Sequence, residues 1–223
     1  MSWQKSFLIV CLLGLLYPAS AQLNIETGFD WQAMRNAALD QALSAHNERL
    51  DYHKSFSNLD NLFGFRLGVR QYLKNHVYTG LNWTMHMQSN KATNPAGQGS
   101  LTRRIYLQSN AVQAMLGLSG RSAGIGTGLS YDLLSTRHKW ENENRSARLD
   151  REGGFHQEVW LEWLPPGNTL VQLSIQPYAR YYYSSRSTLR LQQWLEEGSA
   201  DAAGPDQWGF GVRLVLINGP KPY

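Results

Sequence analysis

Hydrophobic and polar residues alternate with a period of two over most of the chain, the pattern of β-strands whose two faces meet different surroundings. Between residues 77 and 88, the odd positions carry mostly large apolar side chains such as Leu81 and Trp83, whereas the even positions carry mainly polar residues and Gly80. The same alternation predicts eight strands, at residues 23–32, 62–72, 77–88, 104–118, 123–134, 157–164, 169–183 and 207–216.

A five-residue motif repeats three times at the same place in alternate strands. The copies begin at Thr27, Thr79 and Thr127, and each reads Thr, Gly, Phe or Leu, a small polar residue and an aromatic residue. Each separation is about the length of two strands with their connections, so the repeating unit is a β-hairpin. Strands one, three and five are therefore expected to run in the same direction.

The connections between the predicted strands fall into two classes that alternate along the chain. Three connections, at residues 73–76, 119–122 and 165–168, are four-residue turns, and the last contains Pro, Gly and Asn. The other connections are long and cover residues 33–61, 89–103, 139–156 and 184–206. In an antiparallel meander all long connections then leave from one end, and both termini lie at the other. These features predict an all-β, eight-stranded antiparallel up-and-down barrel over residues 22–223.

Alternation does not decide which face looks inward, because a soluble barrel and a membrane barrel share it. Here the polar face is rich in glycine and in charges of both signs, and small side chains suit the narrow interior of an eight-stranded barrel. Opposite charges fall on neighbouring strands, so we expect a lumen ion-pair network in which, for example, Arg213 neutralises Glu26. The predicted network consists of Glu26, Asp30, Arg66, Arg70, Asp132, Glu158, Glu162, Arg180 and Arg213.

Aromatic residues on the apolar face gather towards the strand ends, as in the aromatic girdles of membrane barrels. We also place Tyr78 on this outward face, at the short-turn end. The predicted girdle consists of Trp31, Trp83, Tyr131, Trp163, Tyr181, Tyr183, Trp208 and Phe210. A transmembrane barrel is therefore the preferred interpretation, and a soluble periplasmic barrel that binds an apolar ligand is an alternative.

The first 21 residues have the features of a signal peptide. Lys5 precedes an apolar stretch at residues 7–16, and small residues at 19–21 follow Pro18. Removal of residues 1–21 takes away Cys11, the one cysteine in the sequence, so the mature chain can form neither a disulfide nor a thiolate metal site. No apolar run long enough for a transmembrane helix follows residue 22.

Charge excludes a further class of function. Charged residues make up 17% of the chain, compared with about 25% in typical soluble domains. The net charge of +4 is small and interleaved, so we expect no nucleic-acid partner.

The leader, the eight-stranded meander, the long connections at one end and the short turns at the other together resemble the small outer-membrane proteins of the OmpA/OmpX type. The resemblance covers nearly all of residues 22–217. It implies an outer-membrane location in a Gram-negative cell envelope, with the long loops outside and both termini in the periplasm. It also implies contact with outer-membrane lipid and lipopolysaccharide, and insertion by the barrel-assembly machinery. One departure is that Tyr223, the terminal aromatic residue, is separated from the last strand by residues 218–222.

Two strands contain irregularities. The apolar positions of the fourth strand change from odd to even numbers, which predicts a β-bulge near Ser109 or Asn110. Pro177 lies within the seventh strand and cannot donate to a β-ladder, so a bulge is expected there too. In the first long connection, residues 34–45 are rich in Ala and Leu and predict a short helix at the outer surface.

The residues provide little support for catalysis, so we expect no enzymatic activity, no cofactor and no metal site. His86 is the one histidine placed in a strand interior, and no serine lies near it on that face. An outer-membrane enzyme that modifies lipid acyl chains remains an alternative, and it would need Ser135, His138 and Glu158 to come together. His46 and His53 have no third metal ligand within reach in the sequence.

Loop 139–156 carries equal numbers of acidic and basic residues. A solvated loop is the preferred interpretation, and contact with anionic lipid headgroups is the alternative. The sequence therefore predicts a monomeric, non-enzymatic outer-membrane barrel with a plugged lumen. Its surface loops would act in adhesion, recognition or envelope integrity, with an extracellular ligand as their partner.

Overall fold

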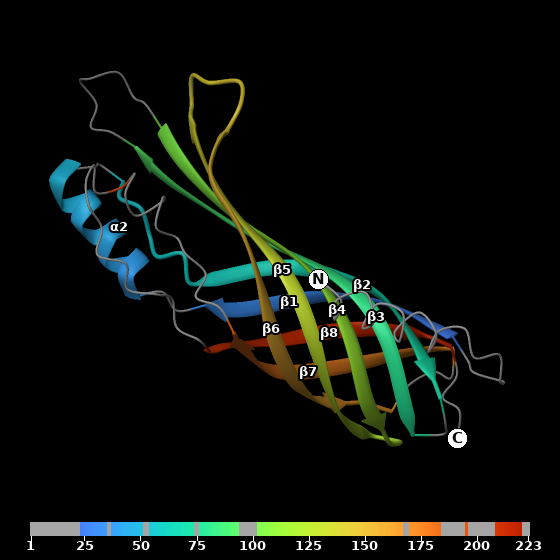
Figure 1. Ribbon diagram of the computed structural model, residues 1–223. Helices are drawn as coiled ribbons and strands as arrows, with labels where there is room; N and C mark the ends of the chain where they lie inside the picture. Colours follow the sequence, from blue (N-terminus) through green and yellow to red (C-terminus); the bar gives the residue numbers. More distant parts are fainter. Residues whose placement is uncertain are drawn as a thin grey trace, which may run out of the picture.

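Eight antiparallel strands follow one another around a closed barrel, and the last strand pairs with the first (Figure 1). The computed structural model describes residues 23–34, 37–50, 54–73, 76–93, 102–166, 170–183, 195 and 208–219. The elements are β1 (Leu23–Met34), α2 (Ala37–Leu50), β2 (Asn61–Tyr72), β3 (Val77–Thr93), β4 (Thr102–Ser119), β5 (Ala123–Trp140), β6 (Ala147–Trp163), β7 (Val171–Tyr182) and β8 (Trp208–Asn218). The predicted barrel is confirmed, whereas the predicted leader and Tyr223 lie outside the described residues.

The apolar face of the barrel points outward. Exposed and buried side chains alternate at every position of β8, and the exposed fraction is 39% for Val212 but 1% for Arg213. Leu129 of β5 is likewise exposed, whereas Arg66 and Glu162 are buried. A water-soluble barrel has the opposite arrangement, so the structure contradicts the soluble-barrel alternative. The outer surface suits hydrocarbon, and barrel closure leaves no unpaired strand edge around the ring.

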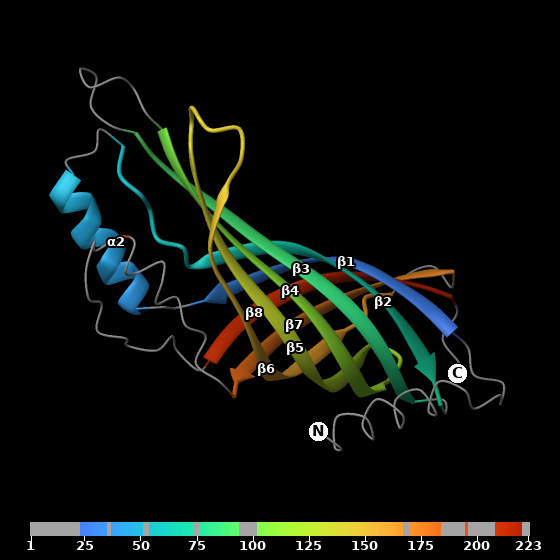
Figure 2. The same ribbon diagram turned by 45° about the horizontal axis from the view of Figure 1, so that its top comes forward.

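Strands β3 to β6 are longer than the others and project beyond them at the end with the long connections (Figure 2). They contain 17 or 18 residues each, compared with 11 or 12 in β1, β2, β7 and β8. We call this projecting part the extended wall; it comprises residues 88–93, 102–108, 135–140 and 147–151. The predicted loop 139–156 is therefore wrong in extent, since strand structure covers most of it. The predicted loop 89–103 is shortened in the same way.

The fourth strand has no bulge where the sequence predicted one. Pairing of β4 with β3 and with β5 continues without a register shift through Ser109 and Asn110. Ile105 and Leu107 point inward like Ser109, and all three are fully buried. The apolar residues move to the inward positions because the barrel interior is apolar at this end and polar further along. The strand itself does not change which of its positions face inward. The one register shift between β5 and β6 lies at Thr136 and Arg137.

Pro177 also lies in a regular strand. It faces Val212 of β8, and the pairing of β7 with β8 continues on both sides of it. On the other edge, the pairs Trp160 with Tyr178 and Trp163 with Ile175 share one register, although the pairing is interrupted between them. The proline therefore removes a ladder hydrogen bond without inserting a residue, and the bulge predicted there is absent.

Helix α2 closes the interior at the long-connection end. The sequence predicted a helix at residues 34–45, and the structure places it at Ala37–Leu50. Leu39, Ala42 and Leu43 lie on one face of α2 and pack against inward side chains of five strands. The resulting apolar cluster, here the mouth cluster, consists of Met34, Leu39, Ala42, Leu43, Phe56, Leu59, Leu62, Ala92, Ile105, Leu107, Leu134 and Leu195. Among the described residues, no helix has the length and apolar character needed to cross a bilayer.

Candidate functional site

Below the mouth cluster, the lumen holds a network of buried charges. All nine charged residues assigned to the polar face are buried, each with at most 2% of its surface exposed. Glu26 of β1 forms ion pairs with Arg70 and, at 3.3 Å, with Arg66, both from β2. Asp30, four residues further along β1, lies 2.9 Å from Arg213 of β8.

Two arginines connect strands on opposite sides of the lumen. The Arg70 guanidinium contacts Glu26 and also lies 3.0 Å from Glu162 of β6. Arg213 joins Asp30 to Glu158 of β6 in the same way. Each of these guanidinium groups therefore neutralises two carboxylates at once, and the network spans the barrel.

The partner that the sequence predicted for Arg213 is wrong. Arg213 contacts Asp30 and Glu158, and not Glu26, whose partners are both on β2. Arg180 forms its ion pair with Glu158, at 2.8 Å, while Glu162 is bound by Arg70. The sequence shows only which strands are neighbours in the sheet, whereas long arginine side chains also reach across a narrow lumen.

Neutral polar residues complete the network and were not identified from the sequence. The Gln113 side chain accepts a hydrogen bond from Asn82 at 2.8 Å and donates one to Glu158 at 3.1 Å. Ser174 and Gln176 donate to Glu162 at 2.9 and 3.0 Å. These bonds go to carboxylate oxygens that also contact Arg213 or Arg70, and such additional hydrogen bonds help a buried charge to be stable. Each of these residues occupies an inward position of its strand. The alternation of the sequence indicates such positions and could have been used to identify them.

The remaining predicted lumen residues lie nearer the mouth. Asp132 accepts a hydrogen bond from Ser109 at 2.8 Å. His86 is fully buried, and its Nε2 lies 3.3 Å from Asp30 Oδ2. Arg180 also donates to Gln32 at 2.6 Å, which links the charged network to the polar residues under the mouth cluster.

Aromatic side chains fill the lumen towards the short-turn end. Tyr78, predicted to point outward, is fully buried, and its hydroxyl accepts a hydrogen bond from Trp160 at 3.2 Å. The Arg70 guanidinium lies 3.9 Å from the centre of the Tyr78 ring, and Arg213 lies 4.1 Å from that of Tyr178. Stacked cations of this kind tolerate burial better than isolated ones. The sequence misplaced Tyr78 because aromatic residues were assigned to the lipid face.

Inward glycines make room for these rings. A Cβ added at Gly117 would overlap the Tyr78 ring, one at Gly126 would overlap Trp160, and one at Gly211 would overlap Tyr178. Each glycine faces its aromatic residue from a neighbouring strand. The period-two glycines of the sequence therefore serve close packing inside the barrel.

The residues of the predicted girdle lie on the outward face. Tyr181 packs edge-on against Trp208 with ring centres 5.0 Å apart, and Tyr131 packs against Phe155 at the same distance. Trp163, more than half exposed, lies at the short-turn end of β6. The outward rows pass from these rings to aliphatic residues, as expected for a surface in lipid.

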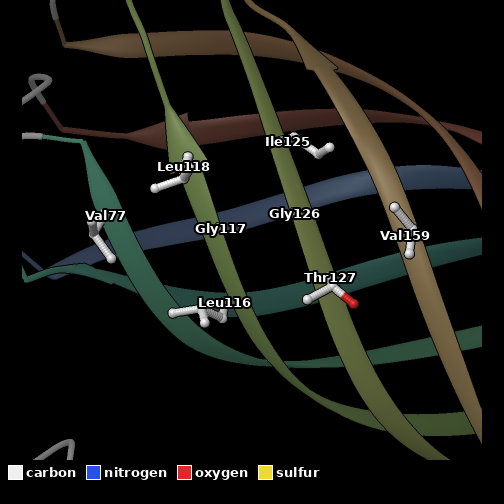
Figure 3. Close-up of a pocket in the computed structure, with 8 residues that line it drawn as sticks. All are labelled: Val77, Leu116, Gly117, Leu118, Ile125, Gly126, Thr127 and Val159. Atoms are coloured by element: carbon white, nitrogen blue, oxygen red, sulfur yellow. The ribbon is translucent and has the colours of Figure 1, made fainter.

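A shallow hollow of about 370 Å³ interrupts the lipid-facing surface over β4, β5 and β6 (Figure 3). Its wall consists of aliphatic side chains, including Leu116, Leu118 and Ile125. The Thr127 hydroxyl donates to the carbonyl of Glu158 at 3.0 Å, so its hydrogen-bonding capacity is used within the sheet. The hollow offers apolar contacts and is suited to hydrocarbon.

The residues considered for catalysis do not come together. Glu158 lies in the lumen opposite Gly128, and Gly128 is seven residues along β5 from Ser135, or about 23 Å at 3.3 Å per residue. His46 is buried in the mouth, where Nδ1 lies 2.6 Å from the Leu195 carbonyl. Within the described part of the chain, no group of three metal-ligating side chains is present, and His53 lies outside it.

Similarity to known proteins is found among solved structures and not among sequences. No family model and no curated protein matches the sequence. The architecture is that of a closed eight-stranded β-barrel with an apolar outer surface. Similar solved structures include the attachment invasion locus protein Ail of Yersinia pestis in complex with the heparin analogue sucrose octasulfate, with 9% identity and a TM-score of 0.48 over 90% of this chain and 98% of Ail.

Two other outer-membrane proteins show the same kind of similarity. A major outer membrane protein from Thermus thermophilus has 10% identity and a TM-score of 0.46, over 87% of this chain and 98% of its own. Neisserial surface protein A has 8% identity and a TM-score of 0.44, over 90% and 99%.

Proposed function

We propose that this protein is a non-enzymatic outer-membrane barrel with a plugged lumen, which acts through its outer end in adhesion, recognition or envelope integrity. The observation that supports the proposal is the burial of apolar, charged and aromatic side chains inside the barrel. The mouth cluster lies at one end, and the charged network is interleaved below it with the cluster of Tyr72, Tyr78, Met115, Trp160 and Tyr178. Side chains held in this way leave function to the surface.

The proposal includes an orientation and partners. The long connections, α2 and the extended wall face the outside, and both termini face the periplasm. The barrel-assembly machinery inserts the chain, the outward residues contact outer-membrane lipid and lipopolysaccharide, and an extracellular ligand binds at the outer end. The lumen ion pairs stabilise the barrel, while the aromatic girdle fixes its depth in the bilayer.

A conductance measurement tests the plug. We expect the purified protein, inserted into a planar lipid bilayer, to give no stepwise current, because its lumen side chains occupy the space in which ions would pass. Slower or faster gel migration after boiling serves as the control that folded barrel was present. A steady current of uniform step size from heat-modifiable protein would contradict the plugged lumen.

Cysteine labelling tests the orientation. Because Cys11, the one cysteine, lies in the predicted leader, single cysteines can be introduced without a background. Asn144 and Ser122 are both exposed, the first between β5 and β6 and the second in the short turn between β4 and β5. On intact cells, a membrane-impermeant maleimide should label Asn144→Cys and spare Ser122→Cys, while both react after lysis. The reverse pattern would overturn the orientation.

A further inference from the structure

The outward face of the extended wall carries two rows of cations. Lys91 of β3 pairs in register with Arg104 of β4, which in turn pairs with Lys139 of β5. In the next row towards the membrane, Arg137 of β5 lies opposite Arg148 of β6. We call these five residues the basic rows. No acidic residue occupies a position in either row within the described strands.

This arrangement is unfavourable for the protein alone. Side chains directly opposite each other in a sheet have Cβ atoms about 5 Å apart, and like charges in such positions destabilise the pairing. Lys91, Arg104 and Lys139 make two such contacts in succession, and the second row adds a third. Glu141 offsets part of this repulsion beside Arg104 and Lys91, and a partner that carries several anionic groups would match the remaining cations.

The same rows contain groups suited to sugars. A small polar pocket of about 140 Å³ lies between Arg104, Tyr106, Lys139, Trp140 and Glu141. The Glu141 carboxylate accepts a hydrogen bond from the Thr102 amide. Hydrogen bonding to the side chain and then the backbone of Thr102, followed by the charges of Arg104 and Lys91, lowers the pKa of Glu141. An aromatic ring, two cations and a fixed hydrogen-bond acceptor together fit a phosphorylated sugar, which offers a ring face, a phosphate and hydroxyl groups.

The position of the rows relative to the aromatic girdle indicates which anion they meet. Arg137 lies six residues beyond Tyr131 on β5, and Lys91 lies eight beyond Trp83 on β3. At 3.3 Å per residue and a strand tilt of about 40°, the rows stand roughly 15–20 Å outside the girdle. The headgroup layer of a phospholipid bilayer extends only about 5–8 Å beyond the hydrocarbon on each side. A headgroup built from several sugars reaches the rows.

We propose that the basic rows bind the phosphorylated sugar headgroup of a glycolipid in the outer leaflet. The phosphates lie along Lys91, Arg104 and Lys139, and a sugar ring occupies the pocket beside Tyr106 and Trp140. The glycolipid acyl chains lie against the apolar surface of β3 to β6 below. This inference rests on the proposed orientation, and it assigns particular residues to the proposed contact with lipopolysaccharide.

Binding is tested with the full-length mature protein in nanodiscs of zwitterionic phosphatidylcholine. The probe is rough-type lipopolysaccharide with a phosphorylated core, incorporated in increasing amounts, and the bound fraction is measured by native mass spectrometry. Each cation near an anionic surface contributes about a fivefold change in affinity, so Arg104→Gln with Lys139→Gln should weaken binding about 30-fold. The matched control, Arg121→Gln with Arg145→Gln, removes the same charge outside the rows and should bind like the wild type.

Three further arms identify the ligand. Lipopolysaccharide treated with phosphatase and phosphatidylglycerol should both bind at least tenfold more weakly than the intact glycolipid. The soluble phosphorylated core oligosaccharide should also bind more weakly, because it lacks the acyl chains. The inference would be overturned if any of these three probes bound as tightly as the intact glycolipid. It would also be overturned if the two double variants lost the same amount of lipopolysaccharide affinity.

The failure of this inference can be separated from failure of the proposed function. Migration of the unheated protein on a gel shows whether each variant is folded, and labelling of Asn144→Cys on cells reports the orientation independently. If the double variant is folded and the orientation holds, unchanged lipopolysaccharide binding rejects the basic rows alone.

Discussion

Arg213→Ala is expected to lower the free energy of unfolding by about 3–5 kcal/mol, because the substitution leaves a buried carboxylate pair without its shared cation. The Arg213 guanidinium lies 2.9 Å from Asp30, contacts Glu158 and stacks on Tyr178. Arg180 still serves Glu158, and the Tyr178 hydroxyl still donates to Asp30 at 2.7 Å, so the barrel should fold while losing stability. Urea unfolding in lipid vesicles, followed by tryptophan fluorescence, measures the change.

A second substitution tests the physical reason. In Arg213→Ala the lumen has an excess of negative charge, so the additional change Glu158→Gln should restore part of the lost stability. Arg145→Ala, at an exposed position between β5 and β6, is the control and should change stability by less than about 0.5 kcal/mol. Equal midpoints for Arg213→Ala and Arg145→Ala would show that the lumen ion pairs do not stabilise the barrel.

The fold could be predicted from the sequence because a transmembrane barrel imposes one rule on every strand. Each residue faces either lipid or lumen. Outward and inward positions therefore alternate with a period of two, as they do at every position of β8. The alternation of short and long connections then orders the strands. Neither inference needs long-range distances, and both agree with the observed topology.

The contacts inside the lumen could not be predicted in the same way. Which acid meets Arg213 depends on how near the closed sheet brings β8 to β6 across the lumen, and this distance is not visible in the residue pattern. Tyr78 shows a related limit, because an aromatic ring suits both a girdle and a lumen with space beside Gly117. Whether the Tyr78 ring faces lipid or lumen is therefore decided by its packing partner and not by the residue type.

The extended wall was missed for a different reason. Outside the bilayer, the outward face of a strand has no hydrocarbon to meet, so apolar residues are no longer required there. Lys91, Lys139 and Arg148 lie in strands, but the sequence placed them in the predicted loops 89–103 and 139–156 because they are charged. These charges indicate a binding surface only when the strand register is known, because the register shows which of them lie next to another cation.

Gly126→Val is expected to destabilise the barrel by about 3 kcal/mol, at the upper end of the range for overpacked interiors. Even a Cβ at this position would overlap the indole of Trp160. Trp160 is 1% exposed and is held by its hydrogen bond to Tyr78, so it has little freedom to move aside. Urea unfolding in vesicles should show a lower midpoint, while Ala123→Val, at an exposed position of the same strand, leaves the midpoint nearly unchanged.

The steric cause predicts a particular non-additivity. Trp160→Ala alone opens a cavity and should cost about 3–5 kcal/mol, but that cavity is the space into which a valine at residue 126 would project. The double variant should therefore be more stable than the sum of the two single effects predicts, by at least about 1 kcal/mol. Strict additivity would mean that the two positions do not share the same space, and that the glycine is required for some property of the backbone.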